Sequence, residues 1–174
     1  MFAANLLRAI TFAGGAAFLI FSQNHSLTLG VNILLYLATA TSIGGLALLL
    51  IPNIKTSMTN LLAPSAIALL IFCYGISTWF GGVDATDKTL STLRVLFGLF
   101  IVALAVTELA QSFLEKNEDT LELRISAGIG ILAALVFFLV PMDILNTLGI
   151  LSAYLALSAV QRGVWMATGF RKES

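Results

Sequence analysis

The chain has 174 residues, of which 59% are hydrophobic and 10% charged, whereas about a quarter of the residues are charged in an ordinary soluble domain. Together with a mean hydropathy of +0.99, this composition excludes a water-soluble globule, a coiled coil, collagen and a disordered chain. Nine basic residues balance nine acidic ones without clustering, so nucleic acid is not expected as a partner.

Long apolar runs separated by short polar breaks indicate an all-α, integral membrane protein. A helix rises 1.5 Å per residue, so about 20 apolar residues cross the roughly 30 Å of hydrocarbon in a bilayer. The sequence therefore predicts a single transmembrane domain over residues 1–174, with the lipid bilayer as its surroundings. The expected spans are residues 5–21, 29–51, 61–80, 90–113, 121–140 and 144–167.

The spacing of the runs predicts that the six-helix bundle is built from three tandem helical hairpins. The runs that begin near residues 6, 61 and 121 each open a pair of helices of similar length, which is the pattern of an internal repeat. Each hairpin returns the chain to its starting side, so any pseudo-symmetry axis is expected along the membrane normal.

Six spans place both termini on one side of the membrane, and basic residues indicate which side. Basic loops are retained in the cytoplasm during insertion, so both termini are expected to be cytoplasmic. The terminal side carries seven basic residues and the other side has Lys88 and Arg94. The seven are Arg8, Lys55, Lys116, Arg124, Arg162, Arg171 and Lys172.

Small residues at four-residue spacing suggest where helices pack closely. Lipid is as apolar as leucine, so membrane helices associate through close backbone approach and interhelical polar contacts. Such faces are expected along Ala9, Ala13 and Ala17, along Ala40 and Gly44, and along Ser126, Gly130 and Ala134.

The last expected hairpin carries the most specific sequence pattern. Arg124 opens a helix that contains Gly128 and Gly130 and ends at Pro141, and the next helix carries the segment 151–162, LSAYLALSAVQR. This pattern resembles the repeat of the HdeD-like family of small bacterial six-span membrane proteins.

Weaker versions of the same pattern occur at residues 93–98 and around Arg8 with residues 14–15, whereas Ser152 and Ala159 stand where the family has glycine. The resemblance implies a bacterial cytoplasmic membrane protein linked to acid resistance and stress response, with no catalytic activity to carry over.

Glu108 and Arg162 are the principal candidate site residues. An ionisable side chain within a span costs about 2.5–3.5 kcal/mol on insertion scales. Both residues lie about five positions from the terminal-side end of their spans, in helices that run in the same direction, so they are expected at matching depth. The interpretations are a protonatable carboxylate tuned by a cation, a static interhelical ion pair, or two side chains that snorkel separately to the interface.

Further polar residues are expected in the bundle interior. Arg94 lies fourteen residues before Glu108, so it shares a helix face with it at an axial distance of about 21 Å, and Gln111 is expected beside that face. Asn32 and Tyr36 lie near one another on the second span. Interhelical hydrogen bonding accounts for these residues without a substrate.

The sequence offers few groups for chemistry. His25 is the single histidine and Cys73 the single cysteine, so neither a metal centre nor a cofactor is expected. The expectation is a non-enzymatic, HdeD-like membrane protein in envelope or acid-stress physiology, or an accessory subunit that binds other membrane proteins or further copies of itself. The alternative is a small transporter or proton-conducting unit that uses Glu108.

Overall fold

The computed structural model describes residues 2–50, 68–75, 87–114 and 120–172. Within these ranges the chain forms helices and no strand. The expectation of an all-α bundle is confirmed. The helices are α1 (Phe2–Phe21), α2 (Leu27–Leu50), α4 (Asp87–Leu114), α5 (Thr120–Leu139) and α6 (Ile144–Lys172), and residues 68–75 are also helical.

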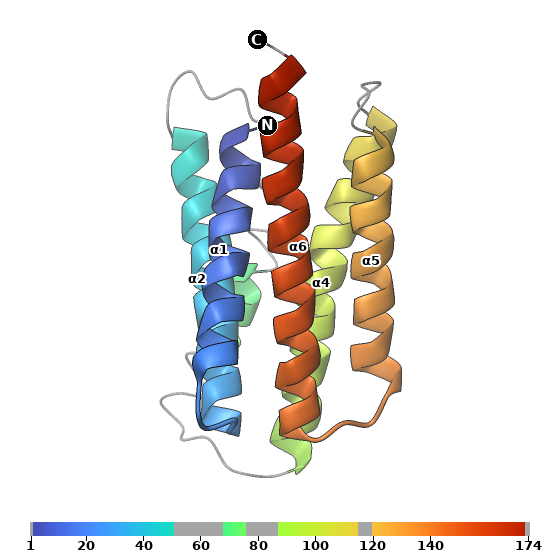
Figure 1. Ribbon diagram of the computed structural model, residues 1–174. Coiled ribbons are helices and arrows are strands. Elements are labelled where there is room, and N and C mark those ends of the chain that lie inside the picture. The colour runs from blue at the N-terminus through green and yellow to red at the C-terminus, as the bar shows by residue number, and fades with distance from the viewer. Residues whose placement is uncertain (1, 51–67, 76–86, 115–119, 173–174) are drawn as a thin grey trace.

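The helices run up and down the length of an elongated bundle (Figure 1). We call one end the terminal end, because α1 begins there and α6 ends there; α4 also ends and α5 begins at that end. At the opposite end, which we call the distal end, α1 and α5 end, and α2, α4 and α6 begin (Figure 1). Residues from the first and last helices therefore lie at the same level as the end of α4.

Four of these helices are long and apolar enough to cross a membrane. Their apolar stretches are Leu27–Ala47, Asp87–Phe113, Thr120–Leu139 and Ile144–Ala167. The apolar part of α1, Asn5–Phe21, is shorter, and at 1.5 Å per residue it is about 26 Å long, below the thickness of the hydrocarbon. Most of the third expected span, residues 61–80, lies outside the described residues.

Polar side chains fix where two of the helices begin. The Asn146 backbone N–H donates to Asp143 Oδ1 at 2.8 Å, one turn into α6, and the Leu29 N–H donates to Ser26 Oγ at 3.2 Å at the start of α2. These are N-cap contacts, which satisfy backbone donors that the first turn of a helix leaves unpaired. The predicted polar breaks therefore act as helix boundaries.

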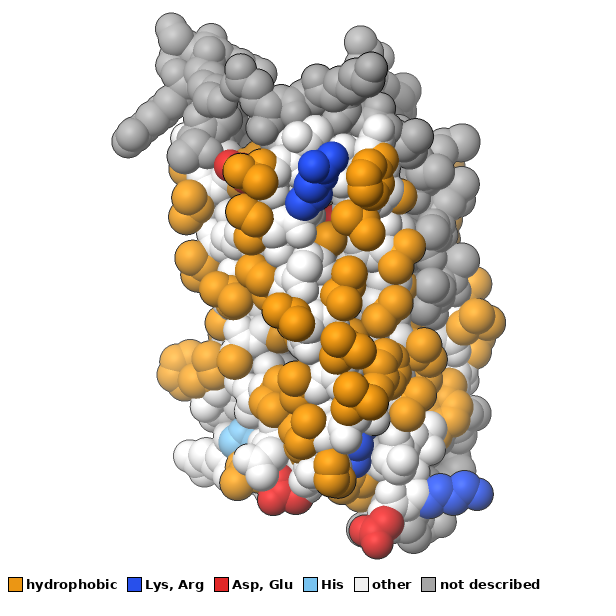
Figure 2. Space-filling view, turned by 90° about the vertical axis from the view of Figure 1, so that its right-hand side faces the viewer, with side chains coloured by type: hydrophobic (Ala, Val, Ile, Leu, Met, Phe, Trp, Pro, Cys, Tyr) orange, Lys and Arg blue, Asp and Glu red, His pale blue; other side chains and the backbone are white. Residues whose placement is uncertain are grey.

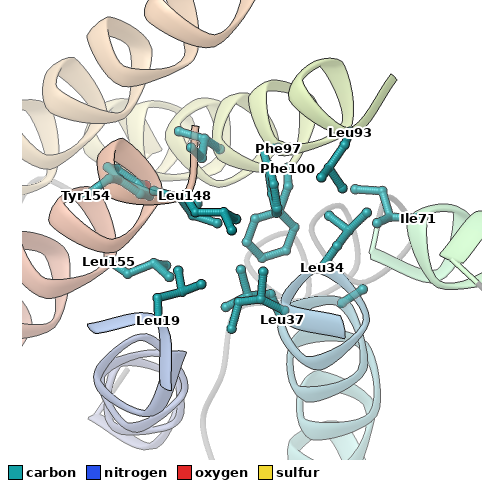
Figure 3. Close-up of a cluster of buried hydrophobic side chains, with 14 of the residues drawn as sticks. Leu19, Leu34, Leu37, Ile71, Leu93, Phe97, Phe100, Leu148, Tyr154 and Leu155 are labelled. Atoms are coloured by element: carbon teal, nitrogen blue, oxygen red, sulfur yellow. The ribbon is translucent and has the colours of Figure 1, made fainter. Parts of the chain in front are cut away.

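The core lies where α4 faces α1, α2 and α6. Phe97 and Phe100 project from α4 toward Leu34 and Leu37 of α2, with leucines of α1 and α6 beside them (Figure 3). The Phe97 ring also lies 6.0 Å from that of Phe137 on α5, in a tilted arrangement, which is a favourable geometry for two aromatic rings. Large side chains thus fill the centre of the bundle.

The most extensive packing joins α4 to α5 and α1 to α6, and α5 has few contacts with α6. The α4–α5 pair is close because α5 presents small residues to its neighbour. A Cβ atom added at Gly130 would lie 2.9 Å from the Cβ of Ala105, so only glycine permits this separation of the two backbones. Of the expected small-residue face, Gly130 and Ala134 are buried and Ser126 is half-buried.

The expected small-residue face of α1 is wrong. Ala9 is buried, but Ala13 and Ala17 are exposed, and the buried face instead carries Phe12 and Leu19. The shift arises because α1 packs most extensively on α6, where large side chains fill the interface and no four-residue run of small residues is needed.

The surface is organised as expected for a helix bundle in lipid. Hydrophobic side chains cover the middle of the face seen in Figure 2, and charged side chains lie near its two ends. Large apolar side chains are well exposed on several helices, for example Ile10, Val106, Leu132 and Val164. An exposed apolar surface of this extent is unusual for a soluble monomer and fits contact with lipid.

Candidate functional site

Glu108 and Arg162 meet inside the bundle at its terminal end. Arg162 Nη2 of α6 donates to Glu108 Oε1 of α4, and the two residues are 7% and 2% exposed. Of the interpretations left open by the sequence, an interhelical ion pair is the one whose geometry is present. Separate snorkelling does not describe these residues, since both charged groups are covered.

A second arginine, which the sequence analysis did not place in the site, also reaches this carboxylate. Arg8 Nη1 of α1 lies 3.6 Å from Glu108 Oε1, and Arg8 is 7% exposed. A signal for it exists in the sequence, because Arg8 lies a few residues inside the terminal-side end of the first span, as Glu108 and Arg162 do in theirs. The count of basic residues places Arg8 on the terminal side but gives it no partner.

The guanidinium of Arg162 is held by α1 as well as by α4. Its Nη1 donates to Asn5 Oδ1 at 3.3 Å, and its central carbon lies 5.6 Å from the centroid of the Phe12 ring, within the range of a cation–π interaction. Its Nε is buried and has no hydrogen-bond partner among the described residues. Three side chains from two helices, Asn5 and Phe12 of α1 and Glu108 of α4, therefore contact this one planar cation.

We call Arg8, Glu108 and Arg162 the charge cluster. Charges are expensive to remove from water, and a buried carboxylate is stable only when cations and hydrogen-bond donors compensate it. Two guanidinium groups from different helices compensate the charge of Glu108. The arrangement can fix α1, α4 and α6 relative to one another, and it holds the carboxylate in one position.

Buried polar side chains continue from the charge cluster toward the end of α4. Thr107, Gln111 and Ser112 are each 8% exposed or less. The Thr107 hydroxyl donates to the Leu104 carbonyl and the Ser112 hydroxyl to that of Leu109, both at 2.7 Å. Gln111 is thus interior, as expected, and the two hydroxyls are satisfied within their own helix.

The other residues expected in the polar interior lie away from the charge cluster. Arg94 is half-buried near the distal end of α4, and its Nε has no hydrogen-bond partner in the described part of the chain. Asn32 is half-buried on α2. The structure does not bring either residue to Glu108.

The expected interior position of Tyr36 is wrong. Tyr36 is 41% exposed, and its hydroxyl donates to the Thr11 carbonyl of α1 at 3.2 Å. A Cβ atom at Gly14 would lie 2.6 Å from that hydroxyl oxygen, so the glycine leaves room for the tyrosine at the edge of the α1–α2 contact. The phenol needs one polar partner and finds it at the surface.

Two further sequence expectations concern chemistry. Among the described residues, no group of three or more histidine, cysteine or acidic side chains is placed to hold a metal ion. Cys73 is exposed, and His25 is half-buried in the turn between α1 and α2.

In comparisons with known proteins, no family model, curated protein or solved structure matches the chain. The resemblance to HdeD-like proteins thus depends on the sequence motifs alone.

Proposed function

We propose that the chain is a non-enzymatic, HdeD-like protein of a bacterial cytoplasmic membrane, which serves envelope or acid-stress physiology or acts as an accessory subunit of a larger membrane complex. The observation that carries this proposal is the contact of Glu108 with both Arg8 and Arg162. The buried carboxylate is engaged by cations of its own bundle, which is the arrangement of a structural support.

The outer faces of the helices are the surfaces through which such a protein would act. Large apolar side chains are exposed along α5 and α6, including Leu132, Leu139, Val160 and Val164. Partners of an accessory subunit, or further copies of the chain, would pack on these faces within the bilayer. Mild-detergent purification tests this part, and a companion present in a constant ratio is the expected result.

We further propose that the terminal end faces the cytoplasm. Arg8, Arg124 and Arg162 lie toward that end, whereas Lys88 and Arg94 lie toward the distal end, and a basic bias marks the cytoplasmic side. In a Cys73→Ser background, a Lys88→Cys variant should react with an impermeant maleimide in intact cells. A Lys55→Cys variant, at a position outside the described residues, should react after permeabilisation; equal reaction of both in intact cells contradicts the orientation.

The alternative is a small transporter or proton-conducting unit that uses Glu108. The observation in its favour is the row of buried polar side chains on α4, Thr107, Glu108, Gln111 and Ser112. Proton movement along such a row requires groups that can exchange partners. The hydroxyls of Thr107 and Ser112 are bonded to carbonyls of their own helix, and this favours the structural interpretation.

Proton flux into vesicles reconstituted with the purified chain separates the two functions. The accessory proposal predicts that wild type and Glu108→Gln show the same background flux as an Asp87→Asn control, whose carboxylate is exposed at the distal end. A wild-type flux that Glu108→Gln abolishes, while Asp87→Asn retains it, contradicts the proposal and supports the conducting unit.

A further inference from the structure

The outward side of α2 carries a row of polar side chains. We call these residues the polar row: Thr28, Asn32, Tyr36 and Thr39. They recur at intervals of four, four and three residues, so they share one side of the helix, and each is exposed or half-buried. The opposite side of this part of α2 enters the apolar core, for example through Leu34. Polar side chains within a membrane generally face other helices rather than lipid, so the polar row indicates a partner.

The other sides of α2 are occupied by the chain's own bundle. Gly44 of α2 lies against Leu7 of α1, and Leu35 of α2 lies against Gly75 in the helical residues 68–75. The core side of α2 contacts α4 and α6. The polar row therefore lies on the side of α2 that remains for a partner outside this chain.

Asn32 is the member of the polar row that most needs a partner. It is the sixth residue of the apolar stretch Leu27–Ala47, so it lies about 7.5 Å inside the end of that stretch. Its side-chain amide has two donors and an acceptor oxygen, and the described residues give this amide no hydrogen-bond partner. Lipid tails offer none. Tyr36, by contrast, donates its hydroxyl to the Thr11 carbonyl, so the bundle satisfies the phenol and leaves the amide open.

We propose that the polar row is the contact between two copies of this chain, related by a two-fold axis along the membrane normal. All copies inserted into one membrane have the same orientation, so such an axis places each residue at the same depth as its counterpart. The amide of each Asn32 then donates to the oxygen of the other, and both amides are satisfied. Hydrogen bonds between side-chain amides associate helices in lipid, and a single asparagine in a helix seam sets the register of the two helices.

A second copy is favoured over a different protein because an amide is its own complement, and the two-fold pair needs no group that this chain lacks. Thr39 lies seven residues after Asn32, which is the repeat of two helices that pack along a common seam, so the same axis brings the two Thr39 side chains near each other. The outer faces of α5 and α6 then remain for other membrane proteins. The inference depends on the proposed membrane location, which vesicle flotation tests separately.

Energy transfer between donor- and acceptor-labelled copies of the full chain measures association in vesicles of phosphatidylethanolamine and phosphatidylglycerol. The labels are attached to a cysteine added at the C-terminus, in a Cys73→Ser background. Transfer should rise with the ratio of protein to lipid, and Asn32→Leu should need about a tenfold higher ratio for half-maximal transfer, because the paired amides are lost. Asn146→Leu, the same replacement at an exposed position of α6, should leave the association unchanged.

Disulfide cross-linking in cell membranes tests which face meets the second copy. In the Cys73→Ser background, Thr39→Cys should give a cross-linked dimer on oxidation, whereas Val160→Cys, on the outer face of α6, should stay monomeric. Cross-linking at Val160 instead of Thr39, or equal association of wild type and Asn32→Leu, would overturn the proposal. A chain that floats with the vesicles but stays monomeric at every ratio would also overturn it, and would leave the membrane location and the accessory role standing. A chain that does not float contradicts the membrane location itself, so the two failures are distinguishable.

Discussion

Arg8 Nη1 lies 3.6 Å from Glu108 Oε1, so the first helix of the bundle reaches the carboxylate that the last helix also contacts through Arg162. α1 and α6 pack extensively on each other, but α1 has little direct packing on α4. The arginine side chain provides the link between α1 and α4. A single carboxylate thus joins helices from the beginning, middle and end of the chain.

Glu108→Gln should destabilise the fold by about 3–5 kcal/mol, because it leaves two buried guanidinium groups without a counter-charge. Reversible unfolding in mixed micelles measures this change. Asp87→Asn is the matched control on the same helix, since its carboxylate is exposed and removal of its charge should cost at most about 1 kcal/mol. Equal stability of the two variants would contradict the role of Glu108 as the counter-charge of two buried guanidinium groups.

Arg8→Gln should cost less than Glu108→Gln. The substitution leaves Glu108 in contact with Arg162, so the remaining pair has no excess charge, and the expected loss is about 1–3 kcal/mol. The same unfolding experiment ranks the two variants. A greater loss for Arg8→Gln would mean that Arg8 supports the fold mainly through groups other than Glu108.

Gly130→Ala should separate α4 from α5. The new Cβ atom would lie 2.9 Å from the Cβ of Ala105, and relief of this overlap should cost about 1–3 kcal/mol. Gly128→Ala is the control on the same helix, because a Cβ atom there meets no atom within 4 Å. If both variants unfold together, the α4–α5 approach is looser than described.

Phe97→Ala should remove a central side chain of the core. Phe97 is 0% exposed, whereas Phe18 is 51% exposed on α1. Loss of a buried phenylalanine costs about 3–5 kcal/mol through the cavity it leaves. The midpoint of unfolding should fall clearly for Phe97→Ala and little for Phe18→Ala, and the reverse order would contradict the placement of the core.

Much of the fold follows from hydropathy and polar breaks. The run expected at 144–167 coincides with the apolar stretch Ile144–Ala167 of α6, which continues as a helix to Lys172. The run at 121–140 matches α5 to within one residue at each end. These helices are delimited by features local to the sequence, such as the polar break before Ile144 and its Asp143 cap. Local features are what periodicity and capping patterns can detect.

Part of the candidate site was also predictable from features local to the sequence. Helix direction and distance from the end of the span place Glu108 and Arg162 at one level, and the structure brings them together. The same argument places Arg8 at this level. Whether charged residues at one level contact each other depends on how each helix is rotated about its own axis. Rotation is set by packing between distant segments, such as α1 with α6.

Helix rotation also explains the wrong expectations for α1 and Tyr36. Ala13 and Ala17 fit a four-residue spacing, but they face outward because the large residues Phe12 and Leu19 enter the core. Tyr36 lies at the edge of the α1–α2 contact, where its hydroxyl finds the Thr11 carbonyl. A repeated spacing identifies residues that share a face, and the neighbouring helices decide which face is buried.

The coupling between Glu108 and Arg162 tests the central claim most directly. Unfolding of wild type, Glu108→Gln, Arg162→Gln and the double variant in the same micelles gives the interaction energy of the two side chains. Direct contact in a buried site predicts a coupling of about 1.5–3 kcal/mol. Additive losses, with no coupling beyond about 0.5 kcal/mol, would contradict the charge cluster and its role in joining α4 to α6.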